Sequence, residues 1–364
     1  MQTLEYLIDL ELLKLIQTFK LEEKFKHVSN FITDDNKSAE FIRSILDDDT
    51  FIHPDEQSPI YDVAKARSRH SALTFLIGLV FKKFGGLYDS FERTTIGGGK
   101  NINLKLWMMT ALSHDKGYYS ERLKKDVPAH LQKFTHTLLT DEYMDDFRTL
   151  RWYSNDIQNV LAYTYADIDI YDMAALDFHT SRGDPERVDH GILGGCIVFD
   201  DYLNKLKKTQ FTVIEKELYI IKTCALTIAQ HNMFKSSTPE HDKNFPNKPS
   251  ILQCSSEFRI SKKTPLLLFL SLIDTFECIK KFSKEENDAH VETLTVLKKI
   301  KLHVDDYAIT VDYSELFDHI KRKKNNNLNQ SQQSYLNSII TLSDWTILKT
   351  TPISKTETYK ITIN

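Results

Sequence analysis

The chain has 364 residues, of which 41% are apolar and 27% are charged, a composition that is ordinary for a soluble globular protein. Its formal net charge of −4 gives it no general affinity for nucleic acid or anionic membranes, so a bound strand would need a local basic groove. The longest apolar runs, such as Pro265 to Phe276, are too short to span a bilayer, and we expect no membrane contact.

The first 48 residues are predicted to form two or three amphipathic helices, broken near Ser29 and near the polar cluster at 34–36. Acidic residues at positions 5, 9 and 11 stand where a secretory signal would carry basic ones, which predicts a cytoplasmic protein. We expect the first helix to pack on its own domain, with a homo-oligomer interface as the alternative. Its apolar positions are Leu4, Leu7, Leu10 (or Glu11), Leu13 and Phe19.

A helix is predicted from about Tyr61 to Phe84, after a polar loop over residues 47–58. His70 lies in the middle of its apolar stripe, and a single histidine in such a place is usually a hydrogen-bonded core residue. Residues spaced three and four apart make up the stripe: Val63, Ala66, His70, Leu73, Ile77 and Val80.

The segment 104–115 is a mostly apolar helical run that ends in His114 and Asp115. A buried helix has little reason to end in two adjacent metal-competent groups unless something compensates their desolvation. Residues 116–189 are predicted to form a polar and aromatic insertion that is helical in part. It contains Lys116, Tyr118 and Arg187, although most charged side chains in such a segment are solvated.

Three further helices are predicted to carry a polar group on an apolar face. In one of them, Gly194 and Gly195 permit another helix to approach closely. The four cysteines of the chain form no C-x-x-C pair, which predicts small buried thiols in a reducing compartment. The inward residues are His190 with Leu193 and Ile197, His231 with Ile221, Cys224 and Ile228, and Asp274 with Leu267 and Leu270.

Beyond residue 296 the pattern changes to that of a small α+β appendage. Alternating segments at 300–304, 307–313, 345–349 and 357–363 predict strands, with a turn at Thr351-Pro352. A helix is predicted at 315–324 and a low-complexity polar loop at 325–333. We therefore predict a helical domain over residues 1–296 and an appendage over 297–364, which is a second candidate surface for forming a homo-oligomer.

Six metal-competent side chains thus lie on the apolar faces of five predicted helices. Burying one such group is ordinary, but burying six is costly unless a cation compensates the desolvation. Imidazole suits zinc, iron, manganese and related ions, and an aspartate can bridge two of them. We expect one or two divalent ions (Mn, Fe, Zn, Ni or Co, with Mg as a further option). The six residues are His70, His114, Asp115, His190, His231 and Asp274.

The order of these residues resembles the HD superfamily of metal-dependent phosphohydrolases, whose pattern is H…HD…H…H…D. The resemblance covers roughly residues 60–280. Arg67-Ser-Arg-His70-Ser71 looks like the family's R-x-x-H-S, and Ala111-Leu-Ser-His114-Asp115 looks like L-L-H-D. Three later segments also resemble family motifs. His190-Gly-Ile-Leu-Gly-Gly is similar to H-G-x-x-G-A, and Ile228-Ala-Gln-His231 is similar to I-x-x-H. Leu268-Phe-Leu-Ser-Leu-Ile-Asp274 is similar to the closing L-x-x-A-D.

The resemblance implies a mainly α fold, the HD-domain helical bundle, with a metal centre inside it. It also implies that His70, His114, Asp115 and Asp274 bind a first metal, and that His190 and His231 bind a second with Asp115 bridging. Two departures stand out. Lys116-Gly117 replaces the I-G-K that commonly follows HD in the family, and no G-Y-P motif is present, which argues against the cyclic-di-nucleotide phosphodiesterase branch.

The expected function is hydrolysis of a phosphoester, in a nucleotide or related phosphate compound, by metal-activated water. Arg67, Lys116 and Arg187 are candidates to stabilise the phosphoryl charge, and Tyr118 to contact a substrate base stacked on the aromatic insertion. The alternatives are an HD-type nuclease on single-stranded nucleic acid, a di-iron oxygenase, and a non-catalytic nucleotide sensor. A steep salt dependence of binding would favour the nuclease, and missing ligands would favour the sensor.

Overall fold

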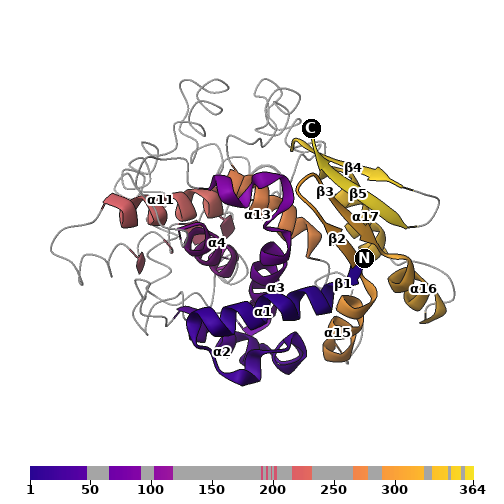
Figure 1. Cartoon of the computed structure of the whole chain (residues 1–364), viewed down its shortest axis with the longest axis horizontal. Coiled ribbons are helices and arrows are strands. Elements are labelled where there is room, and N and C mark those ends of the chain that lie inside the picture. The colour runs from indigo at the N-terminus through magenta and orange to yellow at the C-terminus, as the bar shows by residue number, and fades with distance from the viewer. Residues whose placement is uncertain are drawn as a thin grey trace, which may run out of the picture. The chain divides into compact units, whose positions relative to one another are not determined.

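The computed structural model describes residues 1–46, 65–91, 102–117, 190–191, 194–195, 198, 201–202, 215–231, 265–277, 289–323, 330–342, 346–353 and 357–364 (Figure 1). This part of the chain is mostly helical and contains one antiparallel sheet, so the predicted fold class is confirmed at that level. It divides into two compact units. The first comprises Met1–Asp48, Lys65–Arg93 and Leu268–Asn364, and the second comprises Asp49–Ala64 and Thr94–Leu267.

The first long helix of the first unit is α1 (Leu4–Phe19). Thr3 caps its N-terminus, and the Thr3 Oγ1 atom accepts a hydrogen bond from the Tyr6 N–H at 3.3 Å. The helix ends at Lys20, whose φ of 50° is left-handed. Its buried side chains face α3 (Lys65–Phe81) and α15 (Ala289–Lys299), so packing on its own unit is confirmed. These side chains are Leu4, Ile8, Glu11, Leu12 and Leu15, whereas Leu13 is 45% exposed.

Helix α13 (Pro265–Phe276) belongs to the first unit from Leu268 on, and there its side chains contact those of α3. The rings of Phe81 and Phe276 lie 4.8 Å apart between centroids, in the core between these two helices. The remaining helical segments of the N-terminal part are α2 (Asp35–Leu46) and short 3-10 turns at Glu23–Phe25, Val28–Asn30, Phe84–Gly86 and Tyr88–Ser90.

The sheet of the first unit has the strand order β1-β2-β3-β5-β4, with every neighbouring pair antiparallel (Figure 1). Its strands are β1 (Gln2–Thr3), β2 (Lys301–Val304), β3 (Ala308–Asp312), β4 (Leu348–Pro352) and β5 (Thr358–Ile363). The N-terminal strand, which the sequence did not predict, pairs with β2. The appendage predicted over residues 297–364 therefore shares its unit and its sheet with the N-terminus.

Two local predictions in this region are wrong. Thr351 and Pro352 are the last residues of β4, not a turn, because β4 is an edge strand where proline's missing N–H costs no ladder bond. The predicted polar loop at 325–333 is also too long, since α17 (Gln330–Ile340) starts within it. The predicted helix at 315–324 corresponds to α16 (Ser314–Lys323).

The second unit contains α4 (Ile102–Ser113) and α11 (Glu215–Gln230), which pack on each other. Lys105 Nζ lies 2.7 Å from Glu217 Oε2, and Cys224 Sγ donates to the Leu106 carbonyl at 3.5 Å. Burial raises the pKa of the Cys224 thiol to about 12. Apart from Lys116 and Gly117, the insertion predicted at 116–189 lies outside the described residues.

None of the helices that the structure describes is, by itself, long and apolar enough to cross a membrane. Within these described ranges, one pair bent by 103°, Arg67–Phe81 with Phe84–Ser90, reaches the required length and composition together.

Candidate metal centre

Three buried residues of the second unit, His114, Asp115 and His231, present ligand atoms that all lie within 4.8 Å of one another. His114 and Asp115 occupy the turn directly after α4, and His231 directly follows α11. Asp115 Oδ1 lies 3.6 Å from His114 Nε2 and 3.6 Å from the Nε2 atom of His190, which is helical and buried. We call these four residues the second-unit cluster.

Two histidines of this cluster are oriented by the same local device at a helix end. His114 Nδ1 lies 2.8 Å from the Ala111 carbonyl oxygen, and His231 Nδ1 lies 2.6 Å from that of Ile228. Each carbonyl belongs to the last turn of a helix, where the backbone has no intrahelical partner. A carbonyl only accepts, so Nδ1 carries the proton and Nε2 carries the lone pair, as in metal-binding histidines.

Close backbone packing brings Asp115 and His190 together. A Cβ atom placed on Gly117 would lie 1.9 Å from the His190 carbonyl oxygen, and one on Gly194 would lie 3.3 Å from the His114 carbonyl oxygen. The turn at 114–117 therefore lies directly against the backbone of His190 and Gly194. Close packing at Gly194 agrees with the predicted approach of another helix, since its Cβ atom would also lie 3.2 Å from the Ile228 side chain of α11. No pattern in the sequence indicates that Gly117 takes part in this packing.

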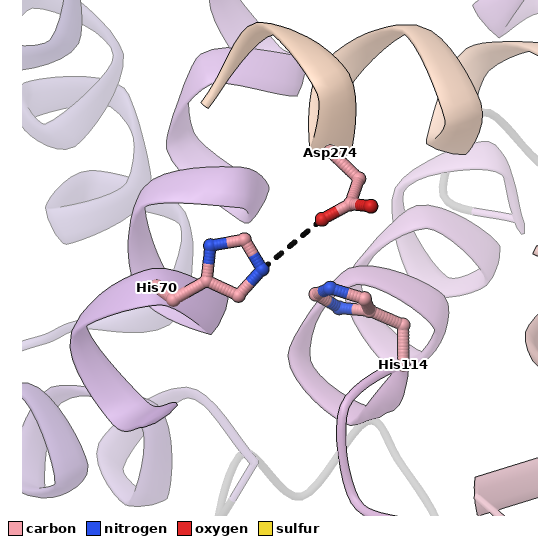
Figure 2. A group of neighbouring side chains, drawn as sticks. All are labelled: His70, His114 and Asp274. Carbon is pink, nitrogen blue, oxygen red and sulfur yellow. Dashed lines mark ion pairs between the residues drawn. The ribbon is translucent and has the colours of Figure 1, made fainter. Parts of the chain in front are cut away.

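The first unit holds a second group, His70 on α3 with Asp274 and Glu277 at the end of α13, which we call the first-unit cluster. His70 Nε2 lies 3.2 Å from Asp274 Oδ1 (Figure 2, which also draws His114 of the second unit). His70 Nδ1 lies 2.7 Å from Glu277 Oε2. The side chains are 4% exposed for His70, 10% for Asp274 and 0% for Glu277.

Sequence reasoning missed Glu277. The one indication in the sequence is its spacing, because three residues after Asp274 is one helical turn and the same helix face. A carboxylate at the end of an apolar helix is normally solvated, however, and only the fold shows that this one is buried against His70.

The donor types and distances fit the predicted metal. Donor atoms bound to one zinc-sized ion, each about 2.1 Å away, lie roughly 3 to 3.5 Å from each other. The His70–Asp274 distance of 3.2 Å falls in this range, and the two distances of 3.6 Å to Asp115 lie just beyond it. Buried histidine and aspartate groups of this chain can therefore hold a metal ion.

The predicted substrate-contacting residues are only partly described. Arg67 is half-buried on α3, one turn before His70, and Lys116 is half-buried directly after Asp115. The backbone N–H of Lys116 donates to the Ser113 carbonyl at 3.0 Å, which fixes the turn that holds Asp115. Tyr118 and Arg187 lie outside the described residues.

A scan against models of protein families, a search of curated proteins and a search of solved structures found no match to this chain. The fold and the two clusters define a mainly helical protein with buried histidine and aspartate groups suited to a metal ion.

Proposed function

We propose that this protein is a metal-dependent phosphohydrolase of the HD type, which cleaves a phosphoester of a nucleotide or a related phosphate compound. The observation that carries the proposal is the second-unit cluster. There, one carboxylate oxygen of buried Asp115 lies 3.6 Å from the Nε2 atoms of both His114 and His190. A carboxylate that lies between two imidazoles can serve as a ligand shared by two metal ions.

The order of the metal-competent residues along the chain also supports the proposal. His70, His114, Asp115, His190, His231 and Asp274 follow the H…HD…H…H…D order of the HD superfamily. The resemblance implies that all six are metal ligands and that Asp115 is shared between two ions.

A metal held by these residues supplies a Lewis acid and a bound water whose pKa falls towards 7. Arg67 and Lys116 carry positive charges that suit the negative charge developing on the phosphoryl oxygens. Arg67 is one helical turn from His70, and Lys116 is adjacent to Asp115, so each cation lies near a ligand in sequence. The I-G-K lysine is absent at its family position, and Lys116 is proposed to take its role.

The first test is the metal content of protein purified without chelator, measured by elemental analysis, followed by a screen of nucleotides and other phosphoesters. We expect two equivalents of a transition metal, and turnover that falls to background in His114→Ala and Asp115→Ala. The matched control is His303→Ala, because His303 is a histidine of β2 whose side chain is 64% exposed.

Each alternative predicts a different result. Full turnover in His114→Ala or Asp115→Ala, or no metal after reconstitution, would refute the proposal. Metal binding without turnover of any phosphoester would favour a nucleotide sensor. Cleavage of a single-stranded oligonucleotide, with binding that weakens steeply as salt rises, would favour the nuclease.

A further inference from the structure

Glu277 is a buried carboxylate that the proposed reaction does not use. Its side chain is 0% exposed, and its Oε2 atom lies 2.7 Å from His70 Nδ1. Burying a carboxylate is costly unless hydrogen bonds or charges compensate it, and this short contact with the imidazole is such a compensation. Glu277 is therefore held in place by His70, and His70 by Glu277.

The contact determines what the other nitrogen of His70 presents. A carboxylate oxygen accepts a hydrogen bond from the imidazole, so Nδ1 of His70 carries a proton and Nε2 is the nitrogen that can bind a metal. That Nε2 atom lies 3.2 Å from Asp274 Oδ1. Both atoms can bind one cation, because this separation fits two ligands of a single zinc-sized ion. Glu277 and Asp274 thus contact the ring at its two different nitrogens.

The backbone that carries Glu277 is anchored as well. The Glu277 N–H donates to the Ile273 carbonyl at 2.8 Å. The hydroxyl of Tyr335 on α17 donates to the Phe276 carbonyl at 3.0 Å, and it lies 2.7 Å from the hydroxyl of Tyr313. Both tyrosines are fully buried. The C-terminal residues of the first unit therefore fix the end of α13 at the residue before Glu277.

We propose that Glu277 is a positioning residue, which fixes the tautomer and ring orientation of His70 as a metal ligand, and that Tyr335 holds the backbone of Glu277 for this purpose. The inference rests on the proposed function, because His70 is a ligand only if the metal centre exists. It adds to that function a residue outside the H…HD…H…H…D pattern. Partners of this kind raise ligand basicity, and their loss typically weakens metal binding 10- to 100-fold.

The test measures metal affinity of the full-length protein by competition with a chromogenic chelator, in wild type, Glu277→Gln and Glu277→Ala. We expect affinity for the ion bound by His70 to fall about 10-fold in Glu277→Gln and about 100-fold in Glu277→Ala. Glutamine keeps the shape and an acceptor oxygen but not the charge, so it should rescue part of the affinity. The protected Nδ1 proton of His70, followed by NMR, should persist in Glu277→Gln and disappear in Glu277→Ala.

The matched control is Glu11→Gln. Glu11 is another carboxylate of the first unit with little exposure, 12% at its side chain. It pairs with Lys14 and Lys82, each at 2.7 Å, and neither lysine belongs to a cluster. This variant should lose stability and keep wild-type metal affinity. A purely structural role of Glu277 would give the same result in Glu277→Gln, which would overturn the inference while leaving the metal centre intact.

A second variant covers the case in which the Glu277 variants fail to fold. Tyr335→Phe removes one hydroxyl and keeps the buried ring, and we expect metal affinity to fall several-fold. Unchanged affinity in Tyr335→Phe would overturn the anchoring role of Tyr335. A wild-type protein that binds no metal would instead refute the proposed function, whatever the Glu277 variants do.

Discussion

Alanine at Gly117 is the sharpest perturbation of the second-unit cluster, because it changes no ligand. Its Cβ atom would lie 1.9 Å from the His190 carbonyl oxygen and 2.6 Å from the Gly194 nitrogen. Ordinary van der Waals contact begins at 3.4 Å, so the two backbones must separate by about 1.5 Å. The three nearest atoms all belong to the backbone, so no flexible side chain can move aside to accommodate the methyl group.

This separation would move Asp115 away from His190, whose contact distance is now 3.6 Å. Metal ligands tolerate only about 0.2 Å of displacement, and a misplacement of about 1 Å can reduce turnover about 100-fold. We expect Gly117→Ala to lose about 1–3 kcal/mol of folding free energy through overpacking. We also expect one metal equivalent to be lost and activity to fall at least 100-fold.

Two further glycine variants separate the effect on the site from the effect on stability. Gly194→Ala makes contacts no shorter than 3.2 Å, so a small adjustment suffices and an intermediate loss is expected. Gly86→Ala meets no atom within 4 Å but has a φ of +63°, so it should cost about 1–2 kcal/mol by backbone strain alone. Elemental analysis and thermal unfolding of all three would show wild-type metal content in Gly86→Ala only. Gly117→Ala with two tightly bound ions and full activity would refute the reasoning.

Three other results are expected. Burial raises the pKa of the Cys224 thiol to about 12, so only about one molecule in ten thousand carries the thiolate at pH 8. A thiol-alkylating reagent, followed by peptide mapping, should therefore leave Cys224 unmodified until denaturant is added. Modification of the folded protein as fast as that of an exposed cysteine would contradict this. Lys105→Met leaves Glu217 partly buried without its partner at 2.7 Å and should cost about 1–2 kcal/mol in urea unfolding, with no change in metal content. A chelator should lower the midpoint temperature of thermal unfolding of the wild type, since a bound ion at 100 times its dissociation constant adds about 2.7 kcal/mol to the free energy of unfolding. An equally large decrease in Asp115→Ala would exclude an ion in the second-unit cluster as the cause.

Local patterns in the sequence predicted most of the helices and three of the strands. The apolar stripe through His70 corresponds to buried α3, and the run into His114 corresponds to α4 with the histidine and Asp115 in the turn after it. These predictions succeeded because helical and strand periodicities depend on residues a few positions apart. The six ligand candidates were all buried except Asp274, which is 10% exposed at its side chain.

Only the tertiary structure decided which of these groups contact one another. Glu277 is separated from His70 by 207 positions, and no local pattern distinguishes it from a solvated carboxylate at a helix end. The same holds for Gly117, which is needed because the His190 backbone lies against it, and for β1, whose partner β2 comes from the other end of the chain. The sequence by itself determined most of the element types and six of the residues able to bind a metal. Their orientation depended on contacts between residues far apart in the chain, because those contacts decide which groups are desolvated together.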